Sequence, residues 1–202
     1  MIDQQKDSGV QEFAGYVYKF LQQYITLNEE SFTRFLPFIE VRRFAKREEL
    51  LRYGQTDEYL NLVVKGLLRK YVLVGKNEKT LQLAIEGQLI QSELSFHMRV
   101  PSTIIIDAIE PSVVVSIRYD NVQYVLENIP ESEIIGREMM TYLFIKKDAK
   151  YFSQLNTTTR ERFLHYVRHH PHMLQRVPQK ILASYLEIKP ETFSRLKHLL
   201  KN

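Results

Sequence analysis

Residues 177–202 read VPQKILASYLEIKPETFSRLKHLLKN, and they predict two short helices joined by a tight turn. Apolar or small residues recur where the two helices would face one another, at Leu182, Ala183, Leu186, Ile188, Phe193 and Leu196. Ala183 falls where the helices approach most closely, and its small side chain permits that approach. This spacing is typical of a helix-turn-helix, whose second helix enters the major groove of DNA. A plain amphipathic helical hairpin is the alternative, because short motifs also match by coincidence.

Positive charge gathers in the same part of the chain. The whole chain carries +4, but residues 157–202 hold nine Lys and Arg against three Glu, which gives +6 there and −2 for the rest. A basic segment on a slightly acidic body favours phosphate contact by that segment. A solvated basic face would have the same composition, so the charge matters because it coincides with the helix-turn-helix.

The composition of the 202 residues is that of an ordinary soluble protein, with 44% apolar and 26% charged residues. There are no cysteines, which excludes disulfides, thiolate metal sites, iron–sulfur sensing and cysteine catalysis. No stretch reaches the ~20 apolar residues of a membrane span. The start, MIDQQKDSG, has no apolar signal-peptide core. We therefore expect a cytoplasmic protein, away from membranes, with one large or two small domains.

The pattern of the sequence changes along the first 118 residues. Residues 11–38 have apolar residues at helical spacing and predict one helix to about Tyr24 and a second from Asn28 or Ser31. From Ile39 onward, short β-rich runs alternate with Gly and Pro. They predict a β-barrel or sandwich, with the jelly roll as the obvious candidate. Residues 75–78, Gly-Lys-Asn-Glu, predict a hairpin turn within it.

Residues 130–155 predict a single helix of about 25 residues. Pro130 fits its first turn, and Glu131 and Glu133 suit the positive end of the helix dipole. Its apolar residues cover more than one face, as expected if one stripe packs on the β domain and another on a second copy. One seam, interrupted by Lys146, consists of Ile135, Met139, Tyr142 and Ala149. A core helix of a single subunit would show a similar pattern.

Two further segments complete the chain. A cap at 157–159, with Glu161 in the first turn, predicts a helix that Pro171 ends. Residues 174–178, LQRVP, then predict a short extended piece before the helix-turn-helix. Three helices are enough to bury one small core.

This order of a jelly-roll-like domain, a long helix and a helix-turn-helix resembles the Crp-Fnr family of bacterial transcription regulators, over essentially the whole chain. QKILASYLEIKPETFSRLK at 179–197 is similar to the family's helix-turn-helix, and the segment at 85–117 is similar to its phosphate-binding cassette. The resemblance implies an α+β fold. It implies a cyclic-nucleotide-binding-like sensor domain at 1–128, a dimerisation helix at 129–156 and a DNA-binding domain at 157–202. It also implies a homodimer on palindromic double-stranded DNA, with RNA polymerase as a further partner.

The resemblance places the base-reading positions on Pro190, Glu191 and Arg195. Glutamate can accept from cytosine N4, and arginine can donate a bidentate pair to guanine. Pro190 stands where members often carry arginine, and it suits the first helical turn without reading a base. The residues predicted to bind DNA are Lys189, Glu191, Thr192, Ser194, Arg195 and Lys197, with His198 as a further candidate. The alternative for each is a solvated surface residue.

Two features of the helix-turn-helix depart from the family pattern. Glu187 stands at the turn position that is usually glycine, where a left-handed backbone would cost roughly 1 kcal/mol. The sequence ends at Asn202, so we expect groove contact to rest on the helix without a C-terminal wing.

The predicted ligand-binding residues are Glu93, Ser92, Ser102 and Thr103, and this cassette departs further. Glu93 matches the acid that accepts from the ribose in nucleotide-binding members, but the preceding glycine is Ser92. The arginine that would pair with the cyclic phosphate is absent from residues 101–103, and Arg99 lies two to four residues too early. A buried phosphate without such a donor is costly. We expect no binding of cyclic AMP in the usual way: the pocket takes another, unidentified effector, or it is empty and structural.

Metal binding and catalysis have weaker support. His165 and His169 are four apart and could share a metal ion, but no nearby carboxylate or cysteine completes a site. A cupin-type metalloenzyme needs several histidines in its barrel, and residues 1–156 contain only His97. No GxSxG, P-loop or dinucleotide motif occurs. We expect no metal, no cofactor and no enzyme activity. The alternative to a DNA-binding regulator is a ligand-sensing or protein-interaction module with a degenerate helix-turn-helix.

Overall fold

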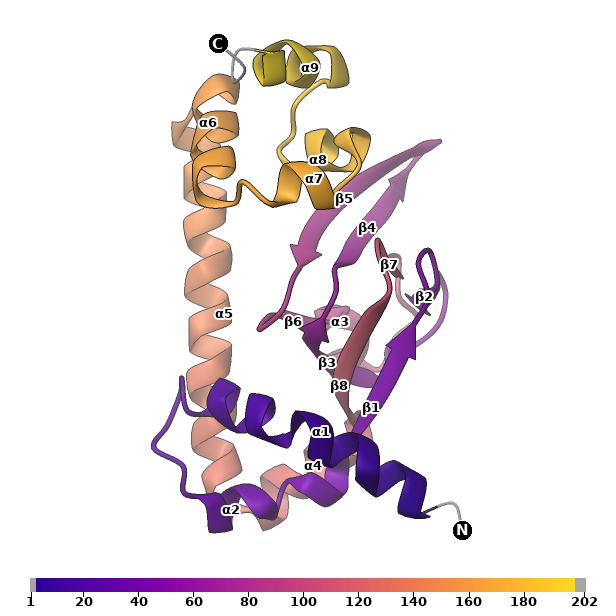
Figure 1. Ribbon diagram of the computed structural model, residues 1–202, viewed down its shortest axis with the longest axis vertical. Coiled ribbons are helices and arrows are strands. Elements are labelled where there is room, and N and C mark those ends of the chain that lie inside the picture. Colours follow the sequence, from indigo (N-terminus) through magenta and orange to yellow (C-terminus); the bar gives the residue numbers. More distant parts are fainter. Residues whose placement is uncertain (1–2, 199–202) are drawn as a thin grey trace.

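Figure 1 shows a computed structural model of the protein, which describes residues 3–198. The strands are β1 (Ile39–Phe44), β2 (Glu49–Leu51), β3 (Tyr59–Lys65), β4 (Leu68–Val74), β5 (Asn77–Ala84), β6 (Leu89–Ile90), β7 (Ile104–Ala108) and β8 (Ser112–Arg118). The helices are α1 (Asp3–Leu21), α2 (Glu29–Thr33), the 3₁₀ turn η1 (Leu36–Phe38), α3 (Glu93–Met98), α4 (Tyr119–Asn128), α5 (Pro130–Asn156), α6 (Thr159–His169), α7 (Met173–Arg176), α8 (Gln179–Tyr185) and α9 (Pro190–His198).

Within residues 3–198, the strands form two four-stranded antiparallel sheets with the orders β1-β8-β3-β6 and β2-β7-β4-β5. Alternate residues of each strand point to opposite faces, so each sheet turns one apolar face inward. The apolar interior between the sheets contains Phe44, Leu51, Val63, Leu68, Ala84, Ile90, Ile106, Ala108 and Val114. The predicted α+β fold with a jelly-roll-like β domain is confirmed.

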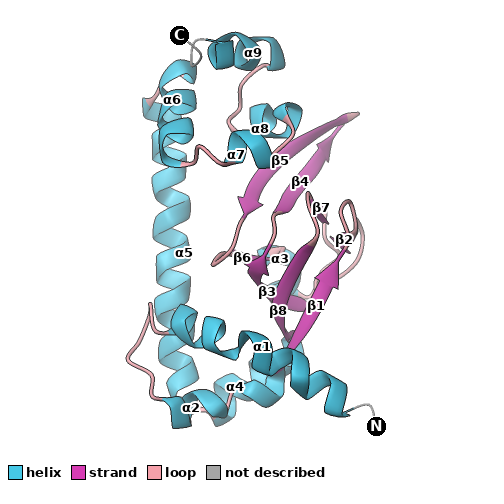
Figure 2. Ribbon diagram, in the orientation of Figure 1, coloured by secondary structure: helices cyan, strands magenta, loops and turns pink. Residues whose placement is uncertain are grey.

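Helices α1, α2, α4 and the start of α5 form a layer at one end of the β domain (Figure 2). Asn28 caps α2 as predicted, since its side chain accepts a hydrogen bond from the Ser31 backbone N–H. The first helix is longer than predicted and begins at Asp3. This layer shares a core with β1, β3 and β8, formed by Val17, Phe20, Leu27, Phe32, Phe35, Leu62, Val64, Val115, Val125, Ile129 and Ile135.

The long helix α5 begins at Pro130, as predicted, and connects the lower helices in Figure 1 to the upper ones. The seam proposed for a second copy is wrong at its start, because Ile135 is buried in the subunit's own core and Met139 packs against it. Tyr142 contacts Tyr24, with ring centres 5.8 Å apart. Periodicity identified a real stripe, but the subunit's own core covers only its first part, since Tyr142 is 49% exposed and Ala149 is also exposed.

The last unit, α6 to α9, has its own core and rests on the β domain. Thr158 and Glu161 form the predicted capping box at the start of α6. The predicted extended piece at 174–178 is partly wrong: Met173–Arg176 form α7, because burying Met173 and Val177 favours a helical turn before Pro178 ends it. The core of this unit also includes Leu67, Leu83 and Ile109 from the β domain, so the two parts pack as one body.

Candidate nucleic-acid interface and ligand cassette

Helices α8 and α9 form the helix-turn-helix around a fully buried centre. Ala183 and Leu182 are buried on α8, and Phe193 and Leu196 are buried on α9. The Phe193 ring meets the Phe163 ring of α6 edge to face, with centres 5.2 Å apart. The predicted close approach of α8 and α9 at Ala183 therefore agrees with the packing, and the polar face of α9 turns outward.

The outward face of α9 carries three of the six residues predicted to bind DNA. Glu191, Ser194 and Arg195 are exposed, at positions that share one face of the helix with His198. Arg195 donates a local hydrogen bond from Nη2 to the Thr192 hydroxyl at 3.3 Å. Lys189 is exposed in the turn, whereas Thr192 and Lys197 are half-buried. Pro190 is the first residue of the helix, as expected.

The turn of the motif has a left-handed backbone at Glu187. Glu187 has a φ of +56°, which usually favours glycine. Its carboxylate lies 3.0 Å from the Nζ atom of Lys79 on β5. A glycine would relieve the backbone but could not make this contact, which gives a physical reason for glutamate at this position.

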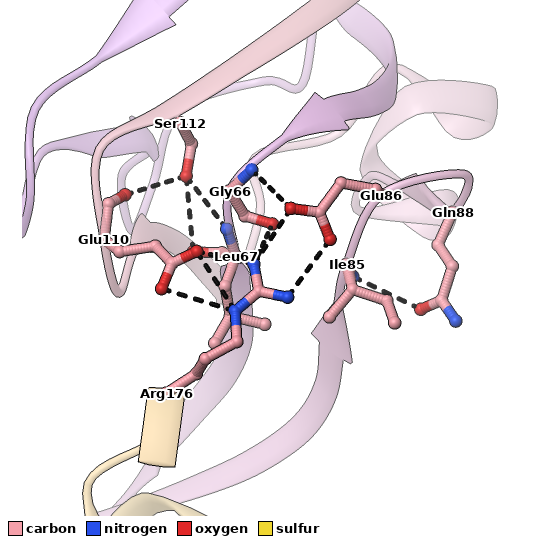
Figure 3. A network of polar contacts seen from close by, with 8 residues as sticks. All are labelled: Gly66, Leu67, Ile85, Glu86, Gln88, Glu110, Ser112 and Arg176. Atoms are coloured by element: carbon pink, nitrogen blue, oxygen red, sulfur yellow. Dashed lines mark hydrogen bonds and ion pairs between the residues drawn. The ribbon is translucent and has the colours of Figure 1, made fainter. Parts of the chain in front are cut away.

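A network around Arg176 fastens the helix-turn-helix unit to the β domain (Figure 3). Its guanidinium donates to the Glu86 carboxylate at 2.9 Å, to the Glu110 carboxylate at 3.2 Å and to the Gly66 carbonyl at 3.0 Å. Hydrogen bonds to Glu110 and then Glu86 raise the pKa of Arg176. Burial alone would raise the pKa of Glu86, but the bond from Arg176 and two backbone bonds outweigh it, so this pKa is lowered.

Gly66 is required by the geometry of the Arg176 network. Its φ is +97°, and a Cβ atom there would lie 2.3 Å from the Ser112 hydroxyl. The backbone can therefore pass close to Ser112, and Gly66 presents its N–H to Glu86 at 2.9 Å and its carbonyl to Arg176. Any side chain would force these groups apart.

An ion pair within the β domain joins strand β4 to the ligand cassette. Lys70, whose side chain is only 8% exposed, places Nζ 2.7 Å from the Glu93 carboxylate and donates to the Gln91 carbonyl at 2.9 Å. Burial alone would raise the pKa of Glu93, but the attraction and hydrogen bond of Lys70 lower it. The acid expected to accept from a ribose therefore already accepts from a lysine.

The serines of the cassette also bind one another. The Ser102 hydroxyl donates to the Ser92 hydroxyl at 2.9 Å, so the structure brings these two predicted residues together. The Ser92 backbone N–H donates to the Asp57 carboxylate at 2.6 Å. Burial raises the pKa of Asp57 despite this bond and a second one from Tyr59. Thr103, the fourth predicted ligand residue, is exposed, and none of these hydrogen bonds involves it.

The remaining cassette residues are packed or paired within the β domain. Phe96 is 1% exposed and packs edge to face on Tyr119. Arg99 stacks on the same Tyr119 ring, pairs with Glu58 and donates to the Asp57 carbonyl, so its guanidinium already has partners within the β domain. Residues 93–98 of the cassette form helix α3.

Sequence reasoning missed Lys70, Asp57 and Arg176. The signal for Lys70 was present, because Arg69 and Lys70 interrupt an otherwise apolar strand. A charged residue inside such a run is rarely buried without a partner. No local signal marked Arg176, whose partners are far away in the sequence.

The described residues give no cluster of three or more His, Cys, Asp or Glu that could hold a metal ion. His165 and His169 stack with ring centres 4.2 Å apart, and the His169 Nδ1 atom lies 2.8 Å from the His165 carbonyl. Among residues 3–198, no helix is long and apolar enough to cross a membrane.

Comparison with known proteins gives a match of fold. No protein-family profile and no curated protein matches the sequence. FixK2 from Bradyrhizobium japonicum is similar with a TM-score of 0.66 and 16% identity, over 81% of this chain and 84% of FixK2. The c-di-GMP-responsive global regulator CLP of Xanthomonas campestris is similar with a TM-score of 0.63 and 17% identity, over 86% of this chain and 92% of CLP.

A cyclic nucleotide-binding domain from Methylobacillus flagellatus is similar with a TM-score of 0.61 and 17% identity, over 70% of this chain and 84% of that domain. These solved structures are Crp-Fnr regulators and cyclic nucleotide-binding domains. The fold expected from the resemblance to the Crp-Fnr family is thereby confirmed.

Proposed function

We propose that the chain is a DNA-binding transcription regulator of the Crp-Fnr type. The observation that carries the proposal is the outward face of α9, where Glu191, Ser194 and Arg195 are exposed side by side on a helix whose other face is buried. A recognition helix needs this combination, because its inner face must fix its position while its outer face meets base edges. The +6 charge of residues 157–202 supports contact with phosphate.

The active form in this proposal is a homodimer joined through α5. Five apolar side chains in the second half of α5 are more than half exposed, and we call them the α5 stripe: Phe144, Ile145, Tyr151, Phe152 and Leu155. Two pairs are seven residues apart, which places each pair on one face, as in a coiled coil. A two-fold dimer would present two copies of α9 to half-sites about 34 Å apart.

The β domain in this proposal does not bind cyclic AMP in the usual way. Lys70 forms an ion pair with Glu93, Ser102 is hydrogen-bonded to Ser92, and Arg99 forms an ion pair with Glu58. A nucleotide would have to break these bonds without gaining a guanidinium for its phosphate. Titration calorimetry should give no saturable heat with cyclic AMP, and micromolar binding would overturn this part of the proposal.

The function is tested by selecting bound fragments from genomic DNA and measuring their affinity by fluorescence polarisation at several salt concentrations. Arg195→Ala should lower the affinity for the selected site by about 5- to 150-fold, the range for one good base contact. Arg137→Ala, at an exposed arginine of α5 outside the basic segment, is the control and should bind like the wild type. No DNA binding at any salt would favour the alternative, a sensing or interaction module with a degenerate helix-turn-helix.

A further inference from the structure

The β4–β5 hairpin of the β domain lies against the helix-turn-helix, at the end where α9 begins. The Ser184 hydroxyl accepts from the Thr80 backbone N–H at 2.9 Å and donates to the Glu78 carbonyl at 3.1 Å. A cleft of about 180 Å³ between the two elements is lined by Asn77 and Glu78 on one side and by Ile188 and Pro190, among others, on the other. The hairpin is therefore held beside the first turn of α9.

The tip of this hairpin is a two-residue turn that presents a lysine to solvent. Val74 pairs with Asn77, so Gly75 and Lys76 alone connect the strands. Gly75 has a φ of +62°, which suits the first position of a tight hairpin turn. Lys76 is exposed, and it has no hydrogen bond or ion pair within the part of the chain that the structure describes. Its ammonium is thus available to a partner from outside the chain.

The charges around Lys76 leave this surface positive. Glu78 is paired with Arg69 at 2.7 Å, and Lys79 is paired with Glu187 at 3.0 Å, so these charges largely cancel. Lys180 on α8 is exposed and lines the same cleft as Asn77. The first residues of the second helix in a helix-turn-helix contact base edges. The hairpin therefore flanks the end of α9 that would face DNA.

We propose that Lys76 contacts the phosphate backbone of bound duplex DNA, which makes the β4–β5 hairpin a second part of the DNA interface. This inference rests on the proposed function, because it assumes that α9 enters DNA. A lysine on a flexible stem suits a point contact with phosphate and carries no base specificity. The β domain would then add affinity without reading the sequence.

The inference is tested with a fluorescein-labelled, mixed-sequence duplex, whose binding depends on phosphate contacts and not on an operator. Affinity is measured by polarisation as a function of salt for the full chain and for Lys76→Ala, Lys76→Glu and Lys19→Ala. Lys19 is an exposed lysine of α1, at the opposite end of the molecule from α9 (Figure 1). The logarithm of the affinity falls as the logarithm of the salt concentration rises. Each lost phosphate contact reduces the magnitude of this slope by about 0.9.

Lys76→Ala should therefore reduce the magnitude of the slope by about 1.8 for a dimer, which loses two contacts. Lys76→Glu should weaken binding further, and Lys19→Ala should match the wild type in slope and affinity. A wild type that binds the duplex while Lys76→Ala has the same slope and affinity overturns this inference alone. A wild type that binds no duplex at any salt overturns the proposed function, and this inference with it. Thermal unfolding of each variant checks that the fold is retained.

Discussion

The Nζ atom of Lys150, on α5, lies 4.1 Å from the ring centre of Tyr185, on α8. The same atom donates a 2.9 Å hydrogen bond to the Leu81 carbonyl on β5, so one side chain joins the long helix, the β domain and the helix-turn-helix. Burial lowers the pKa of Lys150 from 10.5 to about 8, and Glu187 only partly opposes this effect. Burying the charged ammonium therefore lowers the stability of the folded protein at neutral pH.

Lys150→Met is expected to flatten the rise of stability with pH between about 8 and 10.5. The folded pKa of Lys150 is below the unfolded value, so in this window the unfolded chain binds more protons and wild-type stability increases with pH. The shift corresponds to at most about 3 kcal/mol. Urea unfolding of both proteins at the two ends of the window measures how much stability each gains with pH. The contributions of other titrating groups cancel when the two gains are compared.

Lys147→Met, at an exposed lysine of the same helix, controls for the substitution itself. If wild type and Lys150→Met gain the same stability between the two pH values, the buried position of Lys150 does not depress its pKa. A larger gain in the variant would reverse the sign and contradict the argument.

Arg176→Ala should loosen the helix-turn-helix unit from the β domain. The substitution removes hydrogen bonds to Glu86, Glu110 and Gly66, and it leaves two carboxylates without their shared cation. We expect a loss of about 1–3 kcal/mol in the free energy of unfolding, since these groups are only partly buried. Hydrogen exchange of the amides in α7 and α8 should become faster.

Arg176→Lys keeps the charge but loses the fork that reaches three acceptors, so its exchange rates should fall between those of the alanine variant and the wild type. Arg168→Ala, which removes an exposed arginine of α6, should leave them unchanged. Unchanged exchange in Arg176→Ala would show that the shared apolar core alone holds the two parts together.

The Lys70–Glu93 pair should be asymmetric in stability. Lys70 is 8% exposed and Glu93 is 45% exposed, so removing either partner leaves the other in a different environment. Glu93→Met leaves a buried ammonium and should cost about 3 kcal/mol, whereas Lys70→Met leaves a carboxylate that water can reach and should cost about 1 kcal/mol. Urea unfolding near pH 7 compares the two, and equal costs would refute the asymmetry.

The features that sequence predicted correctly are those with local causes. Thr158 and Glu161 cap α6 within one turn, Pro130 starts α5, and Gly75 makes the hairpin turn. Ala183 and Phe193 come together because the spacing within two short helices fixes their approach. Such signals act over a few residues, and no other part of the chain can override them easily.

The features that sequence missed depend on distant residues. Lys70 and Glu93 are 23 residues apart, and Arg176 and Glu86 are 90 apart, so only the tertiary fold decides that they pair. The same applies to α5, where periodicity showed apolar stripes but not which one the subunit covers itself. Of the predicted site residues on α9, Glu191, Ser194 and Arg195 share one exposed face, whereas Thr192 and Lys197 are half-buried. Those of the cassette divide: Ser92 and Ser102 bind each other, and Thr103 stays exposed.

The α5 stripe is the surface on which dimerisation can be tested most directly. Ile145 and Phe152 are 60% and 53% exposed and lie seven residues apart, so they share one face of the helix. The face that holds Ile135 and Met139 is already covered by the subunit's own core, which leaves the α5 stripe for a second copy. Burying a side chain of this size contributes roughly 1.5–3 kcal/mol.

Ile145→Lys with Phe152→Lys should therefore shift the protein to monomer in sedimentation equilibrium and weaken DNA binding, because two half-sites could no longer be held by one particle. Ser153→Lys, at an exposed position of α5 outside the α5 stripe, adds charge without replacing any residue of the stripe and should leave the dimer intact. A double variant that sediments like the wild type would place the subunit contact elsewhere, since two lysines facing their own copies across an apolar seam would repel one another.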